Sequence, residues 1–323
     1  LFLILLVLAF VIKNLFLGYY AWKQADFIAT ITQSISKKIF KKYLESPYTF
    51  HIEKSSSVLI RNVTGEVGHF HGILSAYCQI FVEGMTVFGI FILLVLIEPF
   101  ATLSVTLMIL FVSGVFYYLT REVTLNYGKK RQFHEAKRIF HIQESLGSIK
   151  ELILRGSELF SITSYDFHNI ETARNERNYT FLRSLPKLFL ETLAVFSLGV
   201  IIYLLFLKTN SLTSLIPILG VFAGAAFKII PAFGRLLVSF QNIRFNIPVV
   251  DVIRNELQLK QRRIEEKAIE TNFTKSFKLN NISYTYPKST SQILNNVSLE
   301  IEKGKFIGIF GESGSGKSTL IDI

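Results

Sequence analysis

KFIGIFGESGSGKST, at residues 305–319, is the stretch that decides the fold of the C-terminal part of this chain. Residues 305–310 form an apolar run rich in strand-favouring types, and the run ends at a glycine. Residues 311–318 then fit the spacing G-x-x-x-x-G-K-[ST] of a phosphate-binding loop, or P-loop. A strand that leads into such a loop predicts the opening of an α/β P-loop domain. A chance glycine turn is the alternative, and the eight fitting positions behind a predicted strand argue against it.

The residue types in this loop suit a nucleoside triphosphate. Glycines let successive backbone N–H groups curl around phosphate oxygens, and the following helix directs its positive end toward them. Lys317 is expected to reach the β- and γ-phosphates, and Ser318 is expected to hold Mg²⁺. ATP and Mg²⁺ are therefore the expected cofactors. The candidate binding residues are Gly311, Glu312, Ser313, Gly314, Ser315, Gly316, Lys317, Ser318 and Thr319.

The chain as a whole is too apolar for an ordinary soluble domain. Half of its 323 residues are hydrophobic, and the mean hydropathy is +0.39. Apolar segments long enough to cross a bilayer are therefore expected. They lie at roughly 1–22, 79–97, 100–119, 188–207 and 214–243, the last interrupted by Pro217 and Pro231. These spans predict an all-α transmembrane domain ahead of the P-loop domain.

The N-terminal run LFLILLVLAFV has neither a basic leader nor a small-residue cleavage site, and it begins at Leu1 rather than Met. We expect a truncated chain here rather than a signal peptide. Cys78 is the single cysteine, which excludes an internal disulfide framework and a cysteine-rich metal site. A buried, small hydrophobic role is the simpler interpretation of Cys78.

The net charge of +11 is placed as in a membrane protein rather than a nucleic-acid-binding protein. Its basic residues concentrate in alternate connections between the spans, which is the positive-inside pattern. The residues are Lys37, Lys38, Lys41, Lys42, Lys54 and Arg61 in one connection and Arg121, Lys129, Lys130, Arg131, Lys137, Arg138, Lys150 and Arg155 in the next but one. The turn at Glu98-Pro99 and the link 208–211 are then external, and residues 251–323 are cytoplasmic. A multi-pass protein of the cytoplasmic membrane is expected.

Both long cytoplasmic connections are expected to be helices that continue out of the membrane, because they lack linker composition. Breaks are predicted at Glu45-Ser46-Pro47 and at Arg155-Gly156-Ser157. The second connection carries an apolar stripe with helical spacing, which predicts helix-to-helix packing. The stripe consists of Ile139, Ile142, Leu146, Ile149 and Ile153.

The pattern changes again after the last span. Residues 251–267 are expected to form a charged helix, and the polar stretch Glu270–Ser276 is a candidate domain boundary. The predicted organisation is a transmembrane domain at 1–250, a helical linker at 251–275 and the start of a nucleotide-binding domain at 276–323.

The stretch ISYTYPKSTSQILNNVSLEIEKGKFIGIFGESGSGKSTL, at 282–320, resembles the start of the nucleotide-binding domain of ABC transporters. By that resemblance Tyr286 stacks on the adenine ring. The alternative from its residue type is an ordinary strand tyrosine packed in a sheet. The resemblance also implies a dimer of half-transporters, and we expect a homodimer. Two ATP molecules are then held between the two nucleotide-binding domains. Coupling helices that transmit their motion are expected near 46–52 and 155–162.

The membrane part is similar to bacterial ABC flippases of lipid-linked oligosaccharides and to related polysaccharide exporters. The residues that carry this similarity are 62–67 (NVTGEV), 144–151 (ESLGSIKE) and 186–191 (PKLFLE). The chain departs from the complete family because the family's first span is expected to be missing and the sequence ends at Ile323, before the catalytic acid. We therefore expect this fragment alone to be unable to hydrolyse ATP.

Four cations in or near the spans are candidate substrate ligands, because ionisable groups at bilayer depth usually face a cavity or a partner. They are Lys13, Lys187, Lys228 and Arg235. If they converge on a cavity, they suit the pyrophosphate of a lipid-linked saccharide. The alternatives are that Lys187 pairs with Glu191, that Lys13 snorkels to the interface, and that Lys228 and Arg235 share the cytosolic end of a long helix.

Two further patterns are weak. Gly220 and Gly224 form a G-x-x-x-G that is compatible with close helix packing. The six histidines show no spacing typical of a metal site, and solvated or packing roles are expected for them.

Three functions remain open at this point. The first is an ATP-driven flippase of a lipid-linked oligosaccharide or polysaccharide precursor, with membrane lipid as a partner. The second is another ABC exporter, for a peptide, a lipid A-like lipid or a drug, and a cavity lined by apolar and aromatic groups favours it. The third is a membrane protein that binds ATP as a regulatory switch without transport.

Overall fold

The computed structural model describes residues 2–208, 212–259, 273–286 and 291–322. The chain divides into two compact units, which are described separately. Unit 1 comprises Leu1–Ser46 and Lys54–Gln261, and unit 2 comprises Pro47–Glu53 and Arg262–Ile323.

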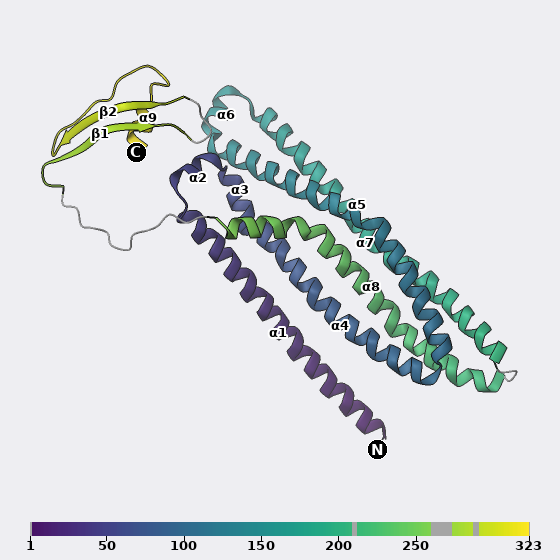
Figure 1. The fold of residues 1–323 in the computed structure, drawn as a ribbon. Helices are drawn as coiled ribbons and strands as arrows, with labels where there is room; N and C mark the ends of the chain where they lie inside the picture. The colour runs from purple at the N-terminus through teal and green to yellow at the C-terminus, as the bar shows by residue number, and fades with distance from the viewer. Residues whose placement is uncertain (1, 209–211, 260–272, 287–290, 323) are drawn as a thin grey trace. The chain divides into compact units, whose positions relative to one another are not determined.

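Unit 1 is entirely helical in its described residues (Figure 1). Its elements are α1 (Phe2–Leu44), α3 (Ser56–Arg61), the π-helix η1 (Asn62–Glu66), α4 (Val67–Ile97), α5 (Pro99–Gly147), α6 (Ile149–Arg155), α7 (Glu158–Lys208) and α8 (Leu212–Leu257). Five helical segments are long and apolar enough to cross a membrane. They are Leu3–Leu44, Ser56–Ile97, Pro99–Gly147, Glu158–Tyr203 and Leu219–Leu257. The five predicted spans and their continuation beyond the bilayer as helix are thus confirmed.

Local signals explain where these helices start and stop. Pro99 occupies the first turn of α5, where its missing N–H leaves no intrahelical bond unmade. Gly156 ends α6 with φ of +60°, a left-handed conformation that glycine adopts without strain. The predicted breaks near residues 45–47 and 155–157 are therefore confirmed.

The fifth span differs from the prediction because α8 continues through its prolines without interruption. Neighbouring helices and side chains in a membrane domain can satisfy the carbonyl groups that a proline leaves unpaired. The helix predicted at 251–267 is, as far as Leu257, the last part of α8. Residues 260–267 and the link 209–211 lie outside the described residues.

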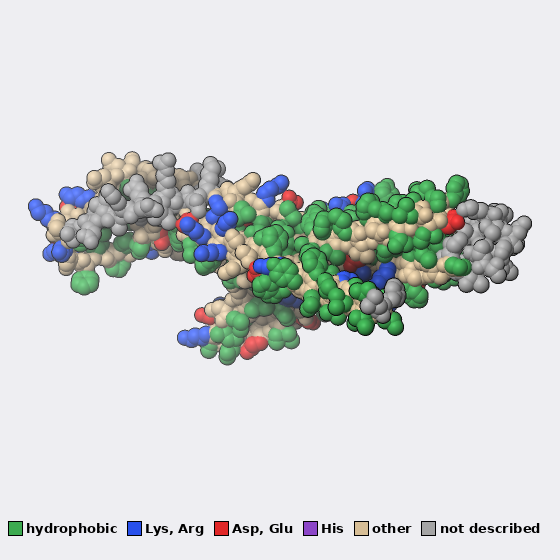
Figure 2. All heavy atoms as spheres, turned by 90° about the horizontal axis from the view of Figure 1, so that it is seen from below, with side chains coloured by type: hydrophobic (Ala, Val, Ile, Leu, Met, Phe, Trp, Pro, Cys, Tyr) green, Lys and Arg blue, Asp and Glu red, His purple; other side chains and the backbone are tan. Residues whose placement is uncertain are grey.

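The long helices pack side by side, α4 against α8 and α5 against α7 (Figure 1). Near the predicted external end, Leu94, Ala101, Ile201 and Phe222 form a buried apolar cluster. Toward the other end, the rings of Tyr179 and Phe245 stack 3.9 Å apart between α7 and α8. Hydrophobic side chains cover most of the visible surface of the bundle in its spanning part (Figure 2). That surface composition suits contact with lipid.

A close approach between α5 and α8 is one that the sequence patterns do not indicate. A Cβ atom built on Gly128 in α5 would lie 1.9 Å from the carbonyl oxygen of Phe245 in α8, so only glycine fits there. The predicted close packing at Gly220 and Gly224 is wrong for the described residues. No heavy atom lies within 4 Å of a Cβ built on either of those glycines.

The predicted apolar stripe is divided between two helices and is not packed. Helix α5 ends at Gly147, and Ser148, with φ of −115° and ψ of 30°, breaks the helical repeat before α6. Leu146, Ile149 and Ile153 are consequently 67%, 47% and 61% exposed. The second predicted coupling segment, 155–162, holds no separate short helix, because α6 ends at Arg155 and the long helix α7 begins at Glu158; its coupling role stays a prediction.

Unit 2 contains α2 (Tyr48–Glu53), β1 (Ser276–Tyr284), β2 (Leu294–Glu302) and α9 (Lys317–Asp322). Helix α2 lies within the first predicted coupling segment, 46–52, except for its last residue, Glu53. Strands β1 and β2 are antiparallel and pair Ser276 with Glu302 and Tyr284 with Leu294. Lys278 bonds Glu300 across the strands at 2.8 Å, which lowers the pKa of Glu300 below its ordinary value.

The strand predicted at residues 305–310 is wrong for this structure, which assigns no ladder to that run. A strand requires a hydrogen-bonded neighbour, and in the described part of unit 2 β1 and β2 pair only with each other. Phe306 and Phe310 are correspondingly 105% and 94% exposed. The P-loop thus follows an extended run rather than a paired strand.

Candidate functional site

The P-loop in unit 2 has the backbone geometry that its glycines predict. Gly314 and Gly316 have φ of +85° and +88°, in the left-handed region that favours glycine. A Cβ on Gly316 would also lie 3.1 Å from side-chain atoms of Ile293 and Leu294. Both conformation and space therefore require glycine at position 316.

Lys317 lies folded over this loop. Its Nζ donates hydrogen bonds to the carbonyl oxygens of Gly311, at 2.8 Å, and Glu312, at 2.6 Å. The hydroxyl-bearing residue Ser318 is exposed. An ammonium group, an exposed hydroxyl and a glycine-rich backbone are the groups that a Mg²⁺-bound triphosphate needs. The residues present therefore fit ATP and Mg²⁺, and their individual roles stay predictions.

Tyr286 lies next to the P-loop in unit 2. Its hydroxyl is 3.1 Å from Oγ1 of the buried Thr319, and its ring meets that of Tyr284 edge-on at 5.1 Å. Tyr286 follows the end of β1 by two residues, so it is not a strand residue. Its position suits contact with a nucleotide in the loop, and adenine stacking stays a prediction.

The four candidate cations of the membrane part do not meet in any described contact. Lys187 lies 3.9 Å from Glu191, as the simpler interpretation expected. Lys13 lies over the ring of Phe10 at 4.7 Å. Lys228 is exposed and has no ion pair among the described residues.

Arg235 instead forms a two-pronged ion pair that the sequence analysis missed. Its Nε and Nη2 donate to the two carboxylate oxygens of Glu83 in α4, at 2.5 and 2.9 Å. Glu83 is 5% exposed and also accepts a hydrogen bond from Gln79 at 2.6 Å. The available signal was an acidic residue inside the apolar run 79–97, which needs a partner at bilayer depth.

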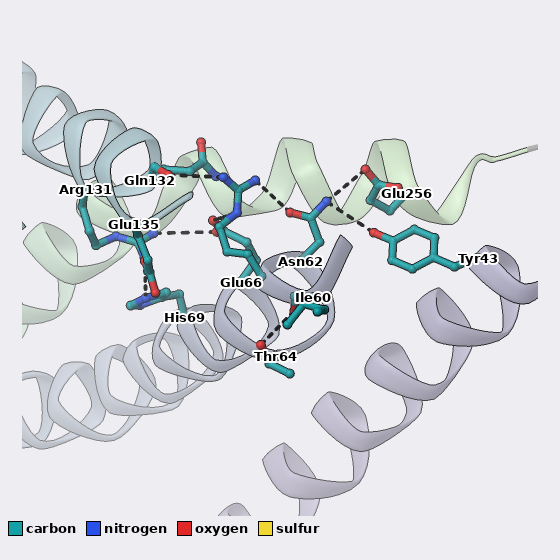
Figure 3. A network of polar contacts seen from close by, with 11 residues as sticks. Tyr43, Ile60, Asn62, Thr64, Glu66, His69, Arg131, Gln132, Glu135 and Glu256 are labelled. Atoms are coloured by element: carbon teal, nitrogen blue, oxygen red, sulfur yellow. Dashed lines mark hydrogen bonds and ion pairs between the residues drawn. The ribbon is translucent and has the colours of Figure 1, made fainter. Parts of the chain in front are cut away.

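A second group of polar residues lies at the predicted cytoplasmic end of the bundle (Figure 3). The carboxylate of Glu66 is fully buried between two guanidinium groups, 3.4 Å from Nε of Arg61 and 3.7 Å from Nη2 of Arg131. Arg131 also donates to Glu135 at 2.8 Å, and His69 lies 3.6 Å from Glu135. Both oxygens of Glu66 lack a hydrogen bond, so its interactions are purely ionic.

Asn62 links this ionic group to two further helices. Its Nδ2 donates to the hydroxyl of Tyr43 at 3.3 Å and to Oε1 of Glu256 at 3.1 Å, and its Oδ1 accepts from Arg61 at 2.8 Å. We call the eight residues that these contacts join the polar network. They are Tyr43, Arg61, Asn62, Glu66, His69, Arg131, Glu135 and Glu256. The network joins α1, the α3-η1-α4 segment, α5 and α8.

The sequence analysis found only part of the polar network. It singled out 62–67 by resemblance, and η1 places Asn62 and Glu66 in a π-helix, a form that is frequent at functional sites. Arg131 was counted there only among the basic residues of a cytoplasmic connection, and its side chain is 1% exposed. No local signal distinguishes a buried arginine from a solvated one in a basic connection.

Three histidines also come together, although their sequence spacing gives no hint of it. Nδ1 of His134 in α5 is 3.0 Å from Nδ1 of His168 in α7, and the ring of His141 stacks on that of His168 at 5.5 Å. Within the described residues no group of three or more possible ligands has a geometry that holds a metal ion.

A cavity of about 370 Å³ lies between α4, α5, α7 and α8 in the spanning part of unit 1. Its lining is apolar and aromatic apart from three hydroxyl residues, Thr102, Thr106 and Ser197, and it contains no cation. On α8 the lining residues include Phe222, Ala226 and Phe233, which share one helical face. Lys228 and Arg235 fall on the opposite face of that helix by the same periodicity.

The chain matches two models of known families. Residues 1–223 match the ABC transporter transmembrane region, and residues 294–323 match the model described as ABC transporter. The first match covers more than half of the chain, and the second contains the P-loop.

Curated relatives agree with these matches. An ATP-dependent lipid A-core flippase of Wigglesworthia glossinidia brevipalpis is 21% identical over 91% of this chain and 50% of its own length. A lacticin-481/lactococcin-DR transport/processing ATP-binding protein of Lactococcus lactis is 25% identical over 90% of this chain and 41% of its own length. A putative export ATP-binding/permease protein of Rickettsia bellii is 22% identical over the whole chain and 56% of its own length.

The chain thus spans about half the length of the curated relatives it matches. Its five membrane-crossing helices, its P-loop geometry and the match of its first 223 residues point the same way. This chain belongs to the ABC transporter family and carries the transmembrane region of a half-transporter followed by the start of its nucleotide-binding domain.

Proposed function

We propose that the intact protein is an ATP-driven exporter of the cytoplasmic membrane that moves a lipid-anchored substrate. One observation carries this proposal: a P-loop with the required glycine conformations follows five membrane-crossing helices in the same chain. Mg²⁺-bound ATP supplies the free energy, and two copies of the half-transporter form the working unit.

The apolar cavity supports a substrate with a hydrocarbon anchor. A lining without cations suits a lipid chain and gives no ligand for a phosphate. This lining is the one expected for the other exporter class, so a lipid-linked oligosaccharide or polysaccharide precursor is a candidate through its hydrocarbon anchor and not through its pyrophosphate. Relatives named as ATP-dependent lipid A-core flippases support a lipid as the substrate.

The cations of the membrane part lend weaker support to a pyrophosphate ligand. Arg235 is already neutralised by Glu83, whereas Lys228 is exposed and unpaired among the described residues. If a headgroup binds this face of α8, Lys228 is the better candidate, with Arg235 offering its remaining N–H groups. Lys13 and Lys187 are less well placed because each contacts its own helix.

Peptide export is the second candidate, and the lacticin transport relative favours it. A regulatory nucleotide switch without transport is the third. The apolar and aromatic cavity is compatible with a hydrophobic peptide or a drug, so the substrate class must be decided by experiment.

The test uses the intact protein in liposomes and measures ATP hydrolysis and transport. A polyprenyl-pyrophosphate oligosaccharide, a lipid A-type glycolipid and a hydrophobic peptide are compared, with Lys317→Met as the inactive control. We expect the polyprenyl-pyrophosphate oligosaccharide to stimulate ATP hydrolysis, and to do so more weakly in Lys228→Ala. We expect no hydrolysis in Lys317→Met. Stimulation by the peptide alone would establish the second candidate, and hydrolysis that no compound couples to transport would favour the regulatory switch.

A further inference from the structure

We propose that the cavity between α4, α5, α7 and α8 binds one hydrocarbon chain of a membrane lipid inside a single copy of this chain. The role of this site in transport rests on the proposed function. Chain binding itself does not, because it requires no nucleotide and no movement of substrate.

The chemistry of the lining favours an apolar occupant over water. A buried water needs about two to four polar partners. The hydroxyl of Thr102 already donates to the carbonyl oxygen of Glu98 at 2.7 Å, and that of Ser197 donates to Ala194 at 2.8 Å. Thr106 has no hydrogen bond in the described part of the chain. With three hydroxyl groups among otherwise apolar side chains, the lining suits a hydrocarbon better than water.

The shape of the cavity matches an extended chain. Lining residues run from Gly84 to Leu94 on α4 and from Phe222 to Leu236 on α8. At 1.5 Å per residue these stretches are about 15–21 Å long, comparable with half of a bilayer's hydrocarbon core of about 30 Å. The cavity volume of about 370 Å³ is distributed along this length, so the cavity is elongated along the helices as an extended hydrocarbon chain is.

A helix is too wide to be the occupant of a cavity of about 370 Å³. An α-helix with its side chains is about 10–12 Å in diameter, so neither a helix of a second copy nor a helical peptide enters this slot. An empty slot is also unfavourable, because its lining atoms forfeit dispersion contacts. At bilayer depth, lipid chains are the abundant molecules that can supply those contacts.

The cavity is accessible from the surface of the bundle. Two of its lining side chains, Phe88 of α4 and Leu110 of α5, are 60% and 53% exposed among the described residues of a single copy. By the charge bias of the connections, the turn at Glu98 is external. The slot therefore extends from the middle of the spans toward the outer leaflet, where a lipid chain can enter between α4 and α5.

A photoreactive lipid tests this site directly. The intact protein is reconstituted without nucleotide in vesicles that contain a phosphatidylethanolamine with a diazirine in one acyl chain, and the cross-linked residues are mapped. We expect labels on cavity residues such as Phe91, Ile229 and Phe233. The matched variants are Ala226→Phe, which fills the cavity, and Ala223→Phe, on the same helix but outside the lining.

We expect Ala226→Phe to reduce cavity labelling about five-fold or more, because overpacking leaves no room for the chain, while Ala223→Phe changes it less than about two-fold. Ser197→Leu fills the slot from α7 and serves if Ala226→Phe does not fold. Labels confined to exposed residues such as Phe227, or cavity labels that neither filling variant reduces, would overturn the proposal. If the intact protein transports none of the three compounds in the liposome assay but its cavity residues are still labelled, the proposed function is rejected and the lipid site is retained.

Discussion

Replacing Glu66 with glutamine tests whether the buried ion pairs hold the cytoplasmic end of the bundle together. The carboxylate is 0% exposed and lies 3.4 and 3.7 Å from Arg61 and Arg131. Unit charges at such distances attract by roughly 4–5 kcal/mol at an effective dielectric constant of about 20. Removal of one partner leaves buried positive charge uncompensated, which costs about 3–5 kcal/mol. Because Arg131 keeps Glu135, we expect Glu66→Gln to lower the unfolding free energy by about 3 kcal/mol.

The assay is SDS-induced unfolding in mixed micelles, followed by far-UV circular dichroism. Asp251→Asn is the matched control, since Asp251 and Arg254 form an ion pair at 3.3 Å whose side chains are 70% and 64% exposed. Such a surface pair is worth less than about 1 kcal/mol. A second variant, Arg131→Met combined with Glu66→Gln, should cost less than the sum of the two single changes, because both remove the same interaction. Equal unfolding curves for Glu66→Gln and Asp251→Asn would refute the reasoning.

Three other predictions follow from single contacts. Gly128→Ala places a methyl group against a carbonyl oxygen of α8 and should lower the unfolding free energy by about 1–3 kcal/mol in the same assay. Gly114→Ala is the control, because a Cβ there meets nothing within 4 Å, and it should not lower that free energy. Equal effects of the two changes would contradict the close approach. Lys317→Met should abolish ATP binding by the intact protein in equilibrium dialysis, and unchanged affinity would remove Lys317 from the site. Arg235→Met should lower the unfolding free energy by about 3–5 kcal/mol, because it leaves Glu83 as an unpaired carboxylate. The double variant Arg235→Met with Glu83→Gln should recover part of that loss. No recovery would argue against the ion pair between Arg235 and Glu83.

The geometry of the P-loop and that of the spans illustrate what local chemistry can predict. The glycines at 314 and 316 are required by backbone conformations within the loop itself, and their spacing is visible in the sequence. The spans are equally local, because any helix at bilayer depth needs about 20 apolar residues in succession. The turn at Glu98 and the left-handed cap at Gly156 were predictable for the same reason. Strand pairing is different, and the run 305–310 shows this, since a strand needs a neighbour that its own residues do not supply.

The sequence by itself determined the membrane-crossing helices, their charge-biased connections and the nucleotide loop, because each of these depends on residues close together in the chain. Only the tertiary structure decided which polar groups are buried. Arg131 has the same local setting as the surface lysines beside it, and only the packing of α5 against Glu66 removes it from water. The Glu83–Arg235 pair and the cavity likewise depend on how α4 and α8 lie together. The buried ion pairs and the cavity arise from contacts between segments that are distant in the chain, so a pattern within one segment cannot predict them.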